Sequence, residues 1–162
     1  MKKTIAYLLV IAAVTIFGFR ISKAIDFKQN VSGYLKRAST ANTIDLAEQE
    51  LSRSIKYLED KKMTTGYTSV IYKTPDEDVD FWYRNLKASQ HELQTLNSSS
   101  ALEKTNVLMK LRETLQETPK GISAFPNNTL WAVLMLFSVI GGFIGFVILT
   151  VEYDAEQKKK KV

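Results

Sequence analysis

Residues 129–151 read TLWAVLMLFSVIGGFIGFVILTV, a run of 23 residues without a charged side chain. At a rise of about 1.5 Å per residue, a helix of this length crosses a hydrocarbon core of about 30 Å. Trp131 lies near one end of the run and Tyr153 just beyond the other, where aromatic side chains favour the membrane–water interface. The stretch predicts a transmembrane helix, and we expect the chain to be an integral membrane protein.

A second apolar segment lies near the N-terminus, where residues 4–19 carry no charge before Arg20 and Lys23. This length also suits the apolar region of a signal peptide, and the tripeptide ending at Ala24 is an acceptable cleavage site. The two basic side chains crowd that site, however. We therefore expect residues 1–25 to be retained as a transmembrane helix whose Arg20 and Lys23 reach the lipid headgroups.

Basic residues at both ends of the chain set the expected orientation. Lys2 and Lys3 precede the first apolar segment, and residues 152–162 form a tail that contains a run of four lysines. Short basic flanks remain in the cytoplasm, so we expect both termini there, in a bacterial inner (cytoplasmic) membrane, with residues 26–128 periplasmic or extracellular. The tail end also matches a K-K-x-x retrieval pattern, but we favour contact with anionic lipid headgroups. The tail lysines concerned are Lys158, Lys159, Lys160 and Lys161.

Residues 26–128 carry four stretches of helical periodicity, which predict helices over about 26–41, 42–61, 74–96 and 100–119. Each helix is apolar on one face, and the first–second and third–fourth connections are short. The economical arrangement is an all-α fold in which two transmembrane helices flank an extracytoplasmic antiparallel four-helix bundle. The expected core positions are Phe27, Val31, Leu35, Ala38, Ile44, Ala47, Leu51, Ile55, Leu58, Val79, Trp82, Leu86, Leu93, Leu96, Leu102, Leu108, Met109, Leu111 and Leu115.

Local signals predict where three of these helices begin. Asn42 is expected to cap the second helix, and Thr74 followed by Pro75 and three acidic residues is expected to start the third. Ser100 with Glu103 forms a capping box for the fourth. The first membrane helix is expected to continue outward as the first bundle helix.

One irregular loop, MTTGYTSVIYK from Met63 to Lys73, is too long for a bundle turn and rich in β-forming residues. In the expected topology it lies near the membrane. We expect Tyr67 and Tyr72 in this loop to contact a partner, a ligand or the interface.

The tripeptide Phe81-Trp82-Tyr83 cannot face a single core, because successive side chains on a helix point about 100° apart. The plain interpretation is that the large rings fill the core and reach the loop. The alternative is that Phe81, Trp82 and Tyr83 contact a partner or ligand, as aromatic side chains often do at interfaces.

No residue cluster in the sequence predicts a reaction. Asp76, Asp78 and Asp80 resemble the start of a calcium loop, but the required glycine is absent and aromatic residues follow, so we interpret them as acids at a helix N-terminus. His91 is the only histidine, and the chain has no cysteine. We expect no enzymatic activity, no cofactor and no metal site.

The second membrane helix carries a stripe of small residues: Ser138, Gly141, Gly142 and Gly145. Small residues spaced four apart let membrane helices approach closely. We expect this face to pack against the first helix, a second copy of the chain or another subunit.

The formal net charge of +5 is concentrated at the chain ends, since residues 27–128 hold fourteen basic and thirteen acidic residues. A nearly neutral domain lacks the basic surface that binds a phosphate backbone, so we expect no nucleic-acid partner. The expected partners are the lipid bilayer and another membrane protein or a second copy, with any small-molecule ligand unknown.

This architecture resembles the sensory half of bacterial chemoreceptors and sensor kinases. The resemblance covers most of the chain and rests on no sequence motif. Those receptors continue into long cytoplasmic signalling helices, whereas about a dozen residues follow the second membrane helix here. The block from Gly66 through Thr74-Pro75 to Phe81-Trp82-Tyr83 is similar to a signature of small bacterial two-transmembrane proteins of unassigned function.

Three hypotheses for function follow. The first is a non-enzymatic accessory or scaffolding subunit of a bacterial inner-membrane protein complex, acting through transmembrane and extracytoplasmic helix contacts. The second is an extracytoplasmic ligand-sensing module without its own output domain, and the third a phage or defence-associated membrane protein. The uncharged second membrane helix argues against a pore.

Overall fold

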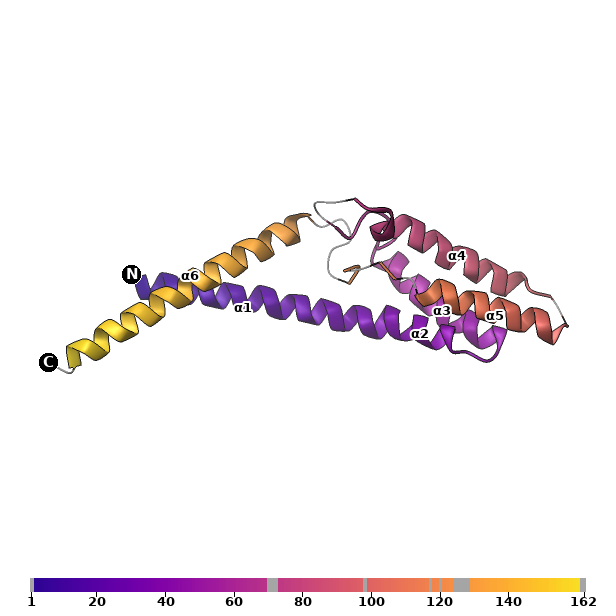
Figure 1. The fold of residues 1–162 in the computed structure, drawn as a ribbon, viewed down its shortest axis with the longest axis horizontal. Helices are drawn as coiled ribbons and strands as arrows, with labels where there is room; N and C mark the ends of the chain where they lie inside the picture. Colours follow the sequence, from indigo (N-terminus) through magenta and orange to yellow (C-terminus); the bar gives the residue numbers. More distant parts are fainter. Residues whose placement is uncertain are drawn as a thin grey trace. The chain divides into compact units, whose positions relative to one another are not determined.

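The computed structural model describes residues 2–69, 73–97, 99–116, 118–119, 121–123 and 129–160. In this part of the chain the fold is helical without named strands, as predicted, and two of the helices are long and apolar. The elements in chain order (Figure 1) are α1 (Lys2–Phe27), a π-helical turn η1 (Lys28–Ser32), α2 (Gly33–Ser39), α3 (Ile44–Asp60), a 3-10 turn η2 (Pro75–Glu77), α4 (Val79–Thr95), α5 (Ala101–Gln116) and α6 (Thr129–Lys160).

The chain divides into two compact units. The helix-pair unit comprises Met1–Ser22 and Asn128–Val162, and the central unit comprises Lys23–Asn127. Two helices among the described residues are long and apolar enough to cross a membrane, Lys2–Ser39 and Thr129–Lys159. The chain therefore has two candidate membrane spans, at the positions that the hydropathy pattern predicted.

The first span is longer than its apolar segment because α1 continues through η1 into α2 without a break. The sequence predicted this continuation, and glycine at position 33 has the lowest helix propensity within residues 26–41. The irregularity instead occupies the five residues before Gly33, which form a π-helical turn, while Gly33 keeps an ordinary helical conformation (φ −62°, ψ −45°). Single π-helical turns within α-helices are uncommon and often accompany a local functional or packing demand.

The central unit has one apolar core, to which α2, α3, α4 and α5 all contribute. Helix α3 contacts α2 on one side and α4 on the other, and α5 contacts α2, α3 and α4. The fully buried core side chains of largest volume are Leu51, Ile55, Leu58, Leu86, Val31 and Val79.

Two expected core positions on α5 are wrong. Leu102 is 71% exposed and Met109 is 54% exposed, whereas Leu111 and Leu115 are buried. At about 100° per residue, Leu102 lies half a turn around the helix from Leu111, so one face cannot contain both. The apolar pattern of α5 is split between two faces. Leu96, which follows α4, is only half-buried, and so are Ile44 and Leu108 at the edge of the core.

The cap of α3 is Thr43, one residue later than predicted. Thr43 has an extended backbone (φ −130°, ψ 150°), and its hydroxyl accepts a hydrogen bond from the Leu46 amide at 3.3 Å. Asn42 is exposed. Because both residue types cap helices well, the sequence pattern could not separate them.

Helix α4 also begins later than predicted. Pro75–Glu77 forms the short turn η2, and Asp78 then caps the α-helix, its Oδ1 accepting hydrogen bonds from the amides of Asp80 (2.9 Å) and Phe81 (3.2 Å). Ser100 caps α5 as expected, since its Oγ accepts from the Glu103 amide at 3.4 Å.

The loop after α3 returns to the start of α4. Gly66 adopts a positive φ of 98°, which a side chain would disfavour, and its carbonyl accepts a hydrogen bond from the Val79 amide at 2.8 Å. The Thr68 amide donates to the Glu77 carbonyl at 3.1 Å, and Tyr67 forms an isolated antiparallel bridge with Asp78. The β-forming residues thus make one bridge that fixes the N-terminus of α4. Residues 70–72 lie outside the described part of the chain.

Candidate functional site

The small-residue stripe of α6 lies against α1 inside the helix-pair unit. A Cβ atom added to Gly145 would lie 2.8 Å from the Ala6 carbonyl oxygen, and one added to Gly142 would lie 2.9 Å from the Ala13 Cβ. A real Cβ essentially never comes this close to another heavy atom, so the two helices pack here without room for an added methyl group. Of the three packing partners that the sequence left open for this stripe, the structure brings it against the first helix.

The other two members of the stripe make looser contacts. A Cβ on Gly141 would lie 3.4 Å from the Leu9 Cδ2, an ordinary van der Waals distance. Ser138, one turn earlier, is buried, and its hydroxyl has no hydrogen-bond partner among the described residues. The stripe therefore packs most closely at its C-terminal end, at Gly142 and Gly145, near the middle of α6.

Polar and aromatic contacts join the same two helices beyond the stripe. Trp131 stacks on Phe19, with ring centroids 4.8 Å apart and an interplanar angle of 12°. At the other end the Lys3 ammonium pairs with Glu156 and lies 3.9 Å from Glu152. Contacts at both ends and in the middle make α1 and α6 a complementary antiparallel pair.

The predicted headgroup-binding residues are mostly accessible. Lys23, Lys158 and Lys159 are exposed and Arg20 is half-buried. The side chain of Lys160 and all of Lys161 lie outside the described residues. Helix α6 continues to Lys160, so the predicted tail is largely an extension of the second candidate membrane span.

The aromatic residues predicted to contact a partner or ligand separate into different environments. Trp82 is 5% exposed and belongs to the core, whereas Phe81 is 55% exposed. Tyr83 turns toward α3 and donates a 2.5 Å hydrogen bond to Glu59. In the loop, Tyr67 is half-buried under the Lys73 ammonium, 5.6 Å from the ring centre, and Tyr72 lies outside the described residues.

A groove of about 330 Å³ lies between the start of α4 and the end of α5, and it contains two of these aromatic residues. Phe81, Trp82 and Asn85 line it from α4, and Asp76 and Asp78 from the turn before that helix. Thr114 and Thr118 line it from the opposite side. The groove thus combines aromatic surface with two carboxylates.

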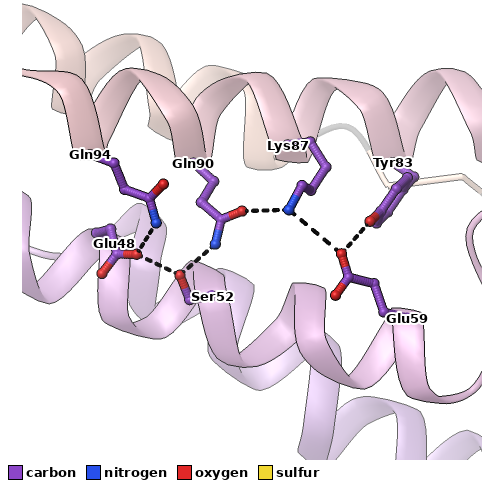
Figure 2. A network of polar contacts seen from close by, with 7 residues as sticks. All are labelled: Glu48, Ser52, Glu59, Tyr83, Lys87, Gln90 and Gln94. Carbon is purple, nitrogen blue, oxygen red and sulfur yellow. Dashed lines mark hydrogen bonds and ion pairs between the residues drawn. The ribbon is translucent and has the colours of Figure 1, made fainter.

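A row of polar contacts, the α3–α4 polar seam, joins two helices along their length (Figure 2). Tyr83 and Lys87 meet Glu59, Gln90 donates to Ser52 at 2.7 Å, and Gln94 donates to Glu48 at 2.7 Å. Within each helix, Lys87 donates to Gln90 at 3.0 Å and Ser52 to Glu48 at 2.7 Å. As the α4 residue number rises, that of its α3 partner falls, so the two helices are antiparallel and held in one register.

The end of this seam near Glu59 shifts the ionisation of two groups. Partial burial, together with the hydrogen bond to Glu59, raises the pKa of Tyr83 to about 12. The hydrogen bond from Tyr83 lowers the pKa of the Glu59 carboxyl, and the charge of Lys87 adds to this effect. The seam therefore favours a neutral phenol beside an ionised carboxylate.

A second row, the junction seam, joins α3 to the continuous helix formed by α1, η1 and α2. Arg37 pairs with the buried Glu50 at 2.7 Å, and the fully buried Ser54 donates to a carbonyl of the π-helical turn, that of Val31, at 3.2 Å. Further along, the Tyr57 hydroxyl donates a 2.6 Å hydrogen bond to the Asp26 carboxylate. Partial burial, together with this hydrogen bond, raises the pKa of Tyr57 to about 12. Glu50 Oε2 has no hydrogen-bond partner within the described part of the chain.

Neither seam was predicted from the sequence, although a signal for the α3–α4 polar seam was present. Tyr83, Lys87, Gln90 and Gln94 recur at intervals of four, three and four, which places them on one face of a helix. Such polar stripes flank apolar stripes on most amphipathic helices and usually face water. Only the partner helix distinguishes a polar stripe that pairs with another helix from one that contacts water alone.

Acidic residues at the start of α4 form no metal cluster. In the described ranges, no three His, Asp or Glu side chains lie close enough together to hold an ion. Asp78 caps the helix and Asp80 pairs with Arg84 at 3.0 Å, as expected for acids at a helix N-terminus.

Comparisons with known protein families, with curated proteins and with solved structures found no match to this chain.

Proposed function

We propose that this chain is a non-enzymatic accessory or scaffolding subunit of a bacterial inner-membrane complex. Its two membrane helices would anchor it, and its central unit would offer contact surface outside the cytoplasm. The observation that carries this proposal is the tight α1–α6 pairing at Gly142 and Gly145, because a pair closed by its own small residues is an anchor that needs no partner to complete it. The outward faces of the two helices and the surface of the central unit would then make the contacts with a partner.

We further propose that the central unit is an antiparallel four-helix bundle on the periplasmic or extracellular side, with both termini in the cytoplasm. Its single core and the polar seams on both sides of α3 support a bundle with fixed register. A scaffold needs such rigidity, because a contact surface that is already ordered loses less conformational entropy on binding.

Outward apolar side chains on α5 offer a surface for a protein partner. Leu102 and Met109 are both more than half exposed and lie seven residues apart on one face of the helix. Neither contributes to the core, so changing them should leave the fold intact. A partner that covers them would bury two large apolar groups.

Cysteine labelling tests the proposed orientation, because the chain contains no cysteine of its own. A single cysteine at the exposed Ser99 should react with a membrane-impermeant maleimide in intact cells. One at the exposed Lys159 should react only after the membrane is permeabilised. The reverse pattern, or equal labelling of both, would contradict the orientation.

Purification from the native host tests the accessory role. A tagged full-length chain, extracted in mild detergent, should bring down a larger membrane protein at a fixed ratio, identified by mass spectrometry. Replacing Leu102 and Met109 by serine should lower that ratio, whereas the matched change Leu46→Ser, at a partly exposed leucine on α3, should not. Recovery of this chain alone would refute the accessory role.

A further inference from the structure

The Lys28 groove, named after the one basic residue in its described lining, is a hollow of about 390 Å³ between the end of α1 with η1 and the segment that follows α5. This volume falls within the range of small-ligand sites, about 300–1,000 Å³. Its lining residues include Phe27, Lys28, Ser32, Thr118, Ile122 and Ser123. Phe27 and Ile122 are each only 4% exposed, so the groove adjoins the apolar core of the central unit.

Hydrogen bonds inside the central unit hold both walls of the Lys28 groove. On one side, the buried Ser54 donates to the Val31 carbonyl within η1. On the other side, the Ile122 amide donates to the Pro119 carbonyl at 3.4 Å. Gly121, between these two residues, adopts a positive φ of 75°, which a side chain would disfavour. The turn after α5 therefore has a defined shape, and the groove is formed without a ligand.

The Lys28 groove offers one positive charge and several hydroxyl groups. Lys28 is exposed, and the described lining contains no acidic residue. Within the described part of the chain, the Lys28 ammonium has no ion-pair partner, and the hydroxyls of Ser32 and Ser123 have no hydrogen-bond partner. An ammonium group beside hydroxyl donors favours an anion with several acceptor oxygens, such as a phosphate group.

Exposed apolar residues on α1 indicate how far lipid would cover this helix. Ile21 is 60% exposed and Ile25 is 50% exposed, and such side chains are more stable away from water. From Thr4 to Ile25 the helix contains 22 residues, about 33 Å, which matches a hydrocarbon core of about 30 Å. Long basic side chains in the last turns of a span can reach the headgroups. Lys28 follows Ile25 by about 4–5 Å along the axis, and would lie in the headgroup layer, which is about 5–8 Å deep.

We propose that the Lys28 groove binds the phosphate group of an anionic phospholipid. The Lys28 ammonium balances the negative charge, and the hydroxyls of Ser32 and Ser123 donate to the phosphate oxygens. A lipid is the favoured source of this phosphate because the groove would lie at the depth of the headgroups. The inference rests on the membrane anchorage of α1 that the proposed function includes, but not on the accessory role or on a protein partner.

NMR of the glycine amides can detect this binding at the groove itself. The chain has seven glycines, so ¹⁵N-glycine labelling gives a simple spectrum, in which Gly121 reports on the groove and Gly66, in the loop after α3, serves as the internal control. The variants Gly121→Asn and Gly66→Asn assign the two signals. The full chain is kept in maltoside micelles, which contain no phosphate, and titrated with dihexanoyl phosphatidylglycerol. We expect the Gly121 signal to shift saturably and the Gly66 signal to stay in place.

Three variants test which groups bind the lipid. Lys28→Gln removes the charge and keeps most of the side chain, and should weaken phosphatidylglycerol binding about fivefold, the contribution of one lysine near an anionic surface. Ser32→Ala with Ser123→Ala removes two hydroxyl donors and should also weaken binding about fivefold or more. The matched control Lys56→Gln gives the same net charge as Lys28→Gln at an exposed lysine of α3 outside the groove, and should have no effect.

Two further ligands identify the source of the phosphate. Dihexanoyl phosphatidylcholine, whose own ammonium offsets the phosphate charge, and inorganic phosphate at constant ionic strength should both bind more weakly than phosphatidylglycerol. Equal binding of inorganic phosphate would reveal a site for a free anion and overturn the lipid assignment. The proposal is also overturned by a Gly121 signal that does not move, by equal shifts of Gly66, or by unchanged affinity in Lys28→Gln. A negative result leaves the co-purification test of the accessory role unaffected.

Discussion

The close packing of α1 and α6 around the α6 glycines predicts a graded loss of stability when a methyl group is added at each position. Gly145→Ala places a Cβ 2.8 Å from the Ala6 carbonyl oxygen and 3.1 Å from the Val10 Cγ2. The carbonyl belongs to the backbone and cannot rotate away, so α1 and α6 must separate. Gly18→Ala is the matched control, since nothing lies within 4 Å of a Cβ built there.

The expected change in stability of each alanine variant is the sum of two opposing effects. Replacing glycine by alanine inside a helix stabilises it by about 0.5–1 kcal/mol, which Gly18→Ala should gain in full. Overpacking a closely packed site costs about 1–3 kcal/mol. Gly145→Ala should therefore be less stable than the parent chain by up to about 2.5 kcal/mol. Gly142→Ala should be affected less, because a Cβ there has one close neighbour, the Ala13 Cβ, whereas a Cβ on Gly145 has three. Gly141→Ala should be tolerated.

Trp131 reports on this pair directly because it stacks on Phe19 of the partner helix. The full chain in mild detergent is titrated with dodecyl sulfate, and tryptophan emission is followed. Subtracting the same titration of a Trp131→Phe version of each variant removes the contribution of Trp82. The midpoint should fall in the order Gly18→Ala, Gly141→Ala, Gly142→Ala, Gly145→Ala.

Equal or greater resistance of Gly145→Ala, compared with Gly18→Ala, would refute the close packing of α6 on α1. The small-residue stripe would then be available to a second copy or another subunit. Loss of stability in all four variants, with no order among them, would also contradict the reasoning, because the distances differ by more than half an ångström.

Three further outcomes are expected in the full chain. Tyr83 should ionise near pH 12 in an ultraviolet titration. Because its pKa is raised in the folded state, its contribution to stability is complete below about pH 10 and is lost as the pH rises through 12. Tyr83→Phe should raise the pKa of Glu59 toward its ordinary value, measured by NMR. Ser54→Ala leaves a buried carbonyl of the π-helical turn without this donor and should cost about 1–3 kcal/mol in thermal unfolding. Thr43→Ala should cost about 1 kcal/mol, whereas Asn42→Ala should cost almost nothing, and the opposite ranking would restore Asn42 as the cap.

The local elements of this fold were predictable because their signals are local. An uncharged run of 23 residues and a shorter one at the N-terminus predict two membrane helices without reference to any neighbour. The apolar stripe of α3 identified Ala47, Leu51, Ile55 and Leu58, all of which are buried. A period of 3.6 residues defines one face whatever that face packs against.

Predictions failed where two local solutions have nearly the same energy. Thr43 and Asn42 are both good caps, and the strong start signal at Pro75 opens a short 3-10 turn before Asp78 caps the helix. On α5, Leu102 and Met109 satisfy a helical period with each other but face away from Leu111. Contacts made elsewhere in the chain choose between such alternatives.

The sequence by itself determined that the chain is helical, where its two apolar helices lie and which stripe of α6 is small enough for close packing. Only the tertiary structure decided that α1 occupies this stripe, that polar side chains of α3 and α4 meet in register, and that Phe81 faces outward beside two carboxylates while Trp82 enters the core. The physical reason is that propensity and periodicity depend on neighbours within a few residues. The partner of a face depends on which distant segments can bury it together.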